Sequence, residues 1–317
     1  MMRLNPLRFG IAALAPGKAL CKMQRVFALA ASACFILFPS CGEAKERAHF
    51  AGAVTAYIAD LKPSFPEHEM YSPATALTTE NYRAVLDGLK SKAGVNGVRL
   101  PIIPEAVRAA DASSLYRRIH AYARQLGLLI YASPMSVGFS KYAGWSNDQY
   151  AEWLADYANV FQPDVLSPFN ESGIDDSRMT KIISALRAKL KISVKLAGPD
   201  RQHVQRTVES LIQHYQIGSL FDIVDSHNAN LDFSANRATW ALLVRVAKGK
   251  PVWSSENPAA WGHGARPGLP GLDQAVRGGV NGIVIWLAKP TLVDDNGRRT
   301  AKADEIATHL LQRDPSR

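Results

Sequence analysis

Two glutamates follow directly on short apolar runs of the sequence: Glu171 ends residues 164–171 and Glu256 ends residues 251–256. Bounded apolar runs of this length are typical of buried strands, and a carboxylate placed there is costly unless it is paired or used. Two such carboxylates facing each other could act on a glycosidic bond. One would protonate the leaving oxygen while the other attacks the anomeric carbon. Taken alone, Glu171 could equally cap the next helix or pair with an arginine.

This chemistry needs two carboxyl groups with different pKa values, the acid's raised and the nucleophile's kept low. Arg99 is a charge embedded in the apolar run 97–101, and it would favour the ionised form of one of the two glutamates. Other polar or aromatic residues stand near the ends of further apolar runs, namely Asp200, His227 and Trp286. These residues can form one site only if the fold brings the run ends together.

Eight short apolar runs are predicted to be strands. They recur at roughly thirty-residue intervals, the size of one βα unit, and cover residues 54–58, 97–101, 128–132, 165–167, 193–197, 223–226, 252–255 and 282–287. Helix signals lie between them. Ser146 begins a capping-box pattern, Ser113 opens a segment that Gly127 closes, and apolar residues at helical spacing begin at Val204 and at Trp240.

Eight strands alternating with helices predict a parallel sheet with right-handed crossovers, and therefore a single (β/α)8 TIM barrel over residues 45–317. A doubly wound open sheet is the alternative, but no Gly-x-Gly-x-x-Gly motif follows the first run. In such barrels the carboxyl ends of the strands gather at one face, where active sites form. Glu171 and Glu256, after runs four and seven, would then face each other across the mouth.

Composition limits the classes of partner. The formal charge is +9, but five basic residues and no acidic one precede residue 41, and without these five the charge is +4. We therefore do not infer nucleic-acid binding. The sequence holds no His-x-His, His-Glu-x-x-His or Gly-x-Ser-x-Gly motif, which argues against a metal hydrolase and an esterase. We expect no metal, no cofactor and a monomer.

Residues 1–44 are predicted to be an export leader. Residues 26–38 form an uncharged apolar run after Arg25, too short for a comfortable membrane span but typical of a secretory signal, and Met23 could be the true start. Residues 38–42 resemble a bacterial lipoprotein box with Cys41 as the lipid acceptor, although ordinary cleavage nearby is an alternative. All three cysteines lie in the first 41 residues, so no disulfide can stabilise the barrel. The protein is predicted to be periplasmic, an outer-membrane lipoprotein or secreted.

The ordered motifs resemble the clan A glycoside hydrolases, which are retaining (β/α)8 enzymes. The resemblance covers roughly residues 53 to 300 and rests on Val98-Arg99-Leu100-Pro101, Ser167-Pro168-Phe169-Asn170-Glu171, Ser226-His227, Trp253-Ser254-Ser255-Glu256 and Trp286. The turn at residues 132–136 and residues 197–200 look most like family 30. That family carries a side β-domain, for which this chain is too short. The His found after strand three in family 5 is also absent.

The resemblance implies a role for each matching residue. Glu171 would be the acid/base, Glu256 the nucleophile and Asn170 the partner of the sugar 2-hydroxyl, while Arg99 and His227 orient the nucleophile and hold the sugar. Trp286 would form the floor of the sugar-binding subsite. Ala229 stands where the pattern usually has a tyrosine, so Tyr131 is a candidate donor to the nucleophile in its place. Outer subsites could use aromatic faces, and the candidates are Trp145, Tyr142 and Trp261.

Each assignment has an alternative at this stage. The three aromatic residues could simply pack their own loops, and His227 could be a core histidine. The expected substrate is an oligo- or polysaccharide with β-linkages, cleaved by double displacement. A carbohydrate-binding barrel with weak or no activity, an inverting enzyme and a transglycosidase would share many of these features.

Overall fold

The computed structural model describes residues 54–63, 75–102, 114–134, 144–171, 173–227, 235–257 and 268–311. The chain divides into two compact units, Met1–His49 and Phe50–Arg317, and every described residue belongs to the second. The predicted leader with its lipidation candidate Cys41 lies outside the described residues, as do Ser113, Tyr142, Ala229 and Trp261. Within the described residues, none of the helices combines the length and apolar character needed to cross a membrane.

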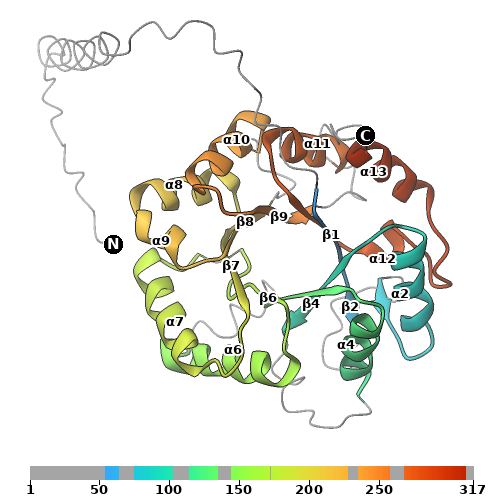
Figure 1. Cartoon of the computed structure of the whole chain (residues 1–317), viewed down its shortest axis with the longest axis horizontal. Helices are drawn as coiled ribbons and strands as arrows, with labels where there is room; N and C mark the ends of the chain where they lie inside the picture. Colours follow the sequence, from blue (N-terminus) through green and yellow to red (C-terminus); the bar gives the residue numbers. More distant parts are fainter. Residues whose placement is uncertain are drawn as a thin grey trace, which may run out of the picture. The chain divides into compact units, whose positions relative to one another are not determined.

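Eight parallel strands close into a barrel (Figure 1). They follow the order β1-β10-β9-β8-β7-β6-β5-β4, and β1 pairs with both β10 and β4, which closes the ring. Their bounds are Ala56–Asp60 (β1), Gly97–Ile102 (β4), Leu129–Pro134 (β5), Val165–Leu166 (β6), Lys195–Arg201 (β7), Ile223–His227 (β8), Val252–Asn257 (β9) and Gly282–Ile285 (β10). Each coincides with one of the predicted strands, so the (β/α)8 barrel is confirmed.

Helices surround this barrel, as Figure 1 shows. They are Tyr82–Ser91 (α2), Leu115–Gln125 (α4), Asn147–Phe161 (α6), Asp176–Lys189 (α7), Val204–Gln213 (α8), Tyr215–Ser219 (α9), Arg237–Val246 (α10), Gly268–Gly278 (α11), Ala288–Thr291 (α12) and Ala301–Leu311 (α13). Two short strands, Lys62–Pro63 (β2) and Ala76–Leu77 (β3), pair outside the barrel and were not predicted from the sequence.

Local signals explain where several helices begin. Ser146 accepts a hydrogen bond from the backbone of Gln149, whose side chain accepts in return from the Ser146 backbone, so the predicted capping box starts α6. The N-cap of α4 is Ser114, one residue beyond the predicted Ser113. The apolar stripe predicted from Val204 is only partly correct, because Ile212 is exposed.

Strand residues alternate between two apolar layers. One side of each strand packs under the helices in the large core, and the other side fills the barrel interior. The interior layer consists of Ala56, Ile58, Tyr131, Val165, Ala197, Ile223, Trp253 and Val284. This layer blocks the barrel below the strand ends, so the polar groups at the carboxyl ends stand on an apolar floor.

Candidate active site

The strand register is interrupted at the carboxyl ends of β7, β8 and β9. Between β7 and β8 the pairing jumps from Pro199 to Arg201, which leaves Asp200 as an extra residue with a positive φ of 47°. Between β8 and β9 it jumps so that His227 faces Glu256 and Ser255 is the extra residue. Such bulges re-aim side chains next to functional sites. Here they bring residues from β7, β8 and β9 into one polar cluster.

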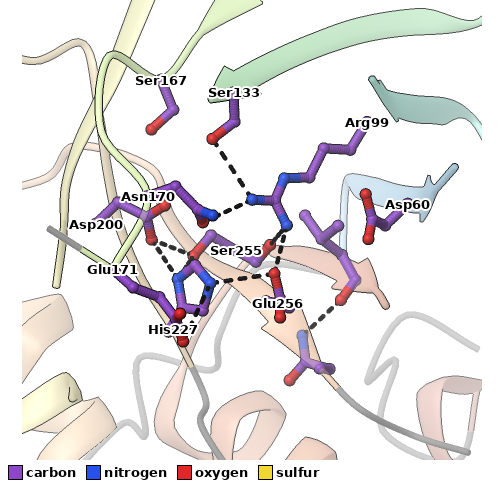
Figure 2. A network of polar contacts seen from close by, with 12 residues as sticks. Asp60, Arg99, Ser133, Ser167, Asn170, Glu171, Asp200, His227, Ser255 and Glu256 are labelled. Carbon is purple, nitrogen blue, oxygen red and sulfur yellow. Dashed lines mark hydrogen bonds and ion pairs between the residues drawn. The ribbon is translucent and has the colours of Figure 1, made fainter. Parts of the chain in front are cut away.

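Glu256 receives two hydrogen bonds on the same oxygen. Its Oε2 accepts from Arg99 Nη1 at 2.7 Å and lies 3.1 Å from His227 Nε2 (Figure 2). Among the described residues, no group donates to Oε1. Burial alone would raise the pKa of this carboxyl, but the nearby charges of His227, Arg99 and Lys62 outweigh it and hold the pKa well below its usual range. Glu256 is therefore an ionised carboxylate. Its Oε2 accepts both hydrogen bonds, and its Oε1 has no donor among the described residues.

Arg99 connects Glu256 with Asn170, the residue before Glu171. Its guanidinium is buried and reaches Glu256 on one side and Asn170 Oδ1 on the other, both at 2.7 Å. Weaker bonds of 3.4 Å reach Ser133 Oγ and the Ser255 carbonyl. Because the Asn170 oxygen faces Arg99, its amide NH2 is the group left to donate elsewhere. The structure thus brings Arg99, Asn170 and Glu256 together, as the sequence predicted.

His227 lies between two carboxylates. Its Nδ1 is 2.7 Å from Asp200 Oδ1 and its Nε2 is 3.1 Å from Glu256. Burial opposes protonation of the imidazole, but Asp200 and Glu256 outweigh burial and raise the pKa of His227 well above its usual value. An imidazolium can donate from both nitrogens, which fits this arrangement. Ser255 Oγ also donates to Asp200, 2.5 Å away.

Asp200 was noted in the sequence only as a strand end, and its role as the partner of His227 was missed. It is fully buried. The available signal was a carboxylate after Gly198-Pro199 at the end of an apolar run, which sequence spacing could not connect to His227. Asp60 was missed as well. It is buried at the end of β1 and forms an ion pair of 2.9 Å with Lys62.

Glu171 has a different environment from Glu256. It follows β6 with a positive φ of 50°, and its side chain is 27% exposed. Its Oε1 lies 3.9 Å from His227 Nε2, beyond hydrogen-bonding distance. Burial raises the pKa of Glu171, His227 opposes that rise, and Glu256 adds to it. The two glutamates therefore have pKa values shifted in opposite directions, as paired acid and nucleophile require.

The aromatic predictions had different outcomes. Trp286 follows β10 at the same end of the barrel and is half-buried, with its backbone N–H donating to the Asn257 carbonyl at 3.0 Å. The prediction that Tyr131 donates a hydrogen bond to Glu256 is wrong. Its buried hydroxyl instead donates to Asp225 Oδ2 at 3.0 Å, because the side chain belongs to the barrel interior.

The contacts of Trp145 favour the alternative that this side chain packs its own loop. It is half-buried against the core, and its ring meets that of Trp153 edge to face with centroids 6.0 Å apart. Trp261 and Tyr142 lie outside the described residues, so their predicted subsite role stays a prediction. Within the described ranges, no group of three or more His, Cys, Asp and Glu side chains is arranged to hold a metal ion.

Neither a family model nor a curated protein matches the chain. Solved structures do. A GH5-4 broad-specificity endoglucanase from Clostridium cellulovorans has a TM-score of 0.55 at 12% identity, over 82% of this chain and 94% of that chain. An endocellulase from Pyrococcus horikoshii, solved with cellotetraose, has a TM-score of 0.52 at 12% identity, over 80% and 92%. The GH113 β-mannanase AaManA from Alicyclobacillus acidocaldarius has a TM-score of 0.49 at 14% identity, over 82% and 98%.

Identities this low show a shared barrel fold and nothing more about this chain. The resemblance to clan A, and to family 30 within it, therefore stays a prediction.

Proposed function

We propose that this protein is a retaining glycoside hydrolase that cleaves β-linked glycans, with Glu171 as acid/base and Glu256 as nucleophile. The observation that carries the proposal is the unequal surroundings of the two glutamates. Arg99 and His227 both bind Glu256, whereas Glu171 lies 3.9 Å from His227, and the two pKa values are accordingly shifted in opposite directions. Buried ion pairs usually stabilise the charged form of every carboxylate in the network. Here the pKa of one carboxyl group is raised beside one that is kept ionised, and glycoside cleavage needs two carboxyl groups that differ in this way.

In the first step, the Glu256 oxygen that accepts no hydrogen bond from a described residue acts as the nucleophile. Glu256 Oε1, to which no described group donates, attacks the anomeric carbon, while Arg99 and His227 hold Oε2. Protonated Glu171 donates its proton to the glycosidic oxygen as the bond from the anomeric carbon to that oxygen breaks. The leaving sugar departs as an alcohol and the other sugar remains as an ester on Glu256. The Asn170 amide NH2, whose Oδ1 accepts from Arg99, would donate to a sugar hydroxyl.

The second step reverses the roles. Esterification removes the negative charge of Glu256, which is one of the groups that raise the pKa of Glu171. Glu171 therefore holds its proton less tightly and can act as a base. It removes a proton from water, the water oxygen bonds to the anomeric carbon, and the ester bond to Glu256 breaks. Both carboxyl groups return to their starting states.

Retention of configuration is supported by the position of His227. Its Nε2 lies 3.9 Å from Glu171 Oε1 and 3.1 Å from Glu256 Oε2, so these two oxygens cannot be further apart than the sum of those distances. That limit excludes most of the range of about 6.5–9.5 Å that is typical of inverting enzymes.

The test is product analysis on a panel of β-glycans, starting with mixed-linkage glucan and soluble cellulose derivatives. These come first because two structures with the same fold are described as an endoglucanase and an endocellulase. We expect the wild type to release sugars whose initial anomer, followed by NMR, is β. Glu171→Ala and Glu256→Ala should each lose this activity. Binding of a glycan by the wild type without cleavage would indicate a carbohydrate-binding protein and refute the enzyme proposal.

We also propose that the protein is exported, on the strength of the apolar run after Arg25 and the acid-free leader. Lipidation at Cys41 is the finer form of that proposal. An exported enzyme would meet glycans outside the cytoplasm, which is consistent with a polymeric substrate.

A further inference from the structure

Two helices that follow each other along the chain, α7 and α8, are not closely packed on each other. α7 packs closely on α6 and α8 packs on α10, whereas α7 and α8 make at most weak contact with each other (Figure 1). A cavity of about 1020 Å³ lies between them and is bounded at its far end by α9. Pockets that enclose a drug-sized ligand have volumes of about 300–1,000 Å³, so this one is larger than a single sugar ring requires.

The cavity meets only one side of the candidate active site. Glu171 and Gly173 belong to its wall, but Glu256, Arg99 and His227 do not. In a retaining hydrolase the acid/base protonates the oxygen of the leaving group, while the nucleophile bonds to the sugar that stays. A cavity that begins at the acid/base and excludes the nucleophile therefore lies on the leaving-group side.

The inner wall of the cavity is a fixed polar surface. Arg201, with its side chain 10% exposed, donates to Asp176 and to the Ile174 carbonyl. Asp176 Oδ1 also accepts from Ser210 Oγ at 3.2 Å, and its Oδ2 lies 3.6 Å from His214 Nε2. Several partners thus hold this carboxylate and guanidinium in place, so the wall does not have to reorganise to meet a ligand.

Exposed polar side chains lie at the rim of the cavity. Lys181 on α7 and Arg206 on α8 are exposed, and neither makes a hydrogen bond or ion pair within the described residues. Gln202 is also exposed at the rim. Among the described residues of the wall, Ile174 and Ile217 are the only apolar ones apart from glycine. A wall with donors, acceptors and charges of both signs suits a hydroxyl-rich ligand and does not suit an apolar one.

We propose that the cavity between α7 and α8 binds the leaving-group side of a β-glycan chain, so that the substrate is a polysaccharide or long oligosaccharide. This assignment rests on the proposed hydrolase function and adds the direction in which the chain lies. Sugar units beyond the cleaved bond extend from Glu171 into the cavity and are held by its polar wall. A disaccharide or a small aglycone would leave most of the cavity unused.

The experiment compares a long and a short leaving group. The wild type is assayed on the polysaccharide that it cleaves best and on the 4-nitrophenyl β-glycoside of the same sugar, whose aryl group would leave most of the cavity unused. Arg206→Trp fills the cavity from α8. Gln205→Trp is the matched control, because Gln205 is exposed on the same helix but does not line the cavity. Lys181→Trp repeats the test from the α7 side.

We expect Arg206→Trp and Lys181→Trp to lower kcat/KM on the polysaccharide by about tenfold or more, and to change kcat/KM on the aryl glycoside by less than about twofold. Gln205→Trp should change neither. Equal loss on both substrates, or no loss on the polysaccharide, overturns the cavity assignment but leaves the hydrolase proposal intact. If the wild type cleaves no polysaccharide but does cleave the aryl glycoside, the assignment is also wrong. If the wild type cleaves neither, both proposals fall.

Discussion

Replacing Asp200 by asparagine tests whether this carboxylate controls the charge of Glu256 through His227. Asp200 is fully buried, and its Oδ1 lies 2.7 Å from His227 Nδ1. Asparagine preserves the size of the side chain but removes its negative charge. A hydrogen bond to a charged group contributes about 1.5–3 kcal/mol, and about 1.4 kcal/mol corresponds to one pKa unit. The substitution should therefore lower the pKa of His227 by about one to two units.

The effect on Glu256 has the opposite sign. His227 and Arg99 hold the pKa of Glu256 low against burial, so a less positive His227 lets that pKa rise. Glu256 must be ionised to attack, and its titration sets the acid limb of the pH profile of kcat/KM. In Asp200→Asn we expect this limb to move to higher pH by about one unit, with kcat/KM at the optimum lowered by about tenfold. Circular dichroism checks that the variant is folded.

Asp225 provides a matched control for this measurement. It is fully buried on the neighbouring strand β8 and accepts a hydrogen bond from Tyr131. Burial and the nearby charge of Asp200 raise the pKa of Asp225 well above its usual value, which favours its neutral form. Asp225 makes no hydrogen bond to His227 or Glu256, so Asp225→Asn should leave the acid limb in place. An unmoved limb in Asp200→Asn, or an equal shift in both variants, would refute the relay from Asp200 to Glu256.

Three further outcomes are expected. Burial and Glu256 raise the pKa of Glu171, so Glu171 sets the alkaline limb, and Glu171→Gln should remove that limb and slow hydrolysis of an unactivated glycan by about 100-fold or more, measured by reducing-sugar release. Trp145→Ala should lower the free energy of unfolding in urea by about 0.5–1.5 kcal/mol through the lost Trp153 contact while kcat/KM stays unchanged; a large loss of kcat/KM would restore its subsite role. Cys41→Ala should move the protein from the membrane fraction to the soluble exported fraction, and identical fractionation of variant and wild type would contradict lipidation.

The sequence predicted the strands well but placed several ends too early. The run predicted to end at Ala197 continues as β7 to Arg201, and the strand expected to end at Ser255 reaches Asn257. The reason is physical. Hydrophobic periodicity identifies a strand by its buried apolar residues, whereas backbone pairing continues into the polar residues that carry the site. The strand ends that matter for function are therefore the part that an apolar pattern describes least well.

The site itself was predicted in its residues and only partly in its contacts. Arg99, Asn170 and Glu256 could be connected because a barrel brings its strand ends to one face. The contact between His227 and Asp200 could not, since it depends on the register shifts that leave Asp200 and Ser255 as extra residues. Tyr131 shows the same limit. Its side chain points into the barrel toward Asp225, and strand order alone does not reveal which way a side chain faces when both faces are buried.

The barrel fold alone would not justify an enzymatic proposal, since the same fold serves many chemistries. The two glutamates differ in how the neighbouring cations bind them. Arg99 and His227 both bind Glu256, and both on one oxygen, whereas Glu171 lies beyond hydrogen-bonding distance of the nearest cation. A network that served only stability would be expected to pair every buried carboxylate, because an unpaired one is costly. Among the described residues no group donates a hydrogen bond to Glu171, which is half-buried and has a raised pKa. This arrangement lowers stability, and it is accounted for if that carboxyl has a proton to deliver.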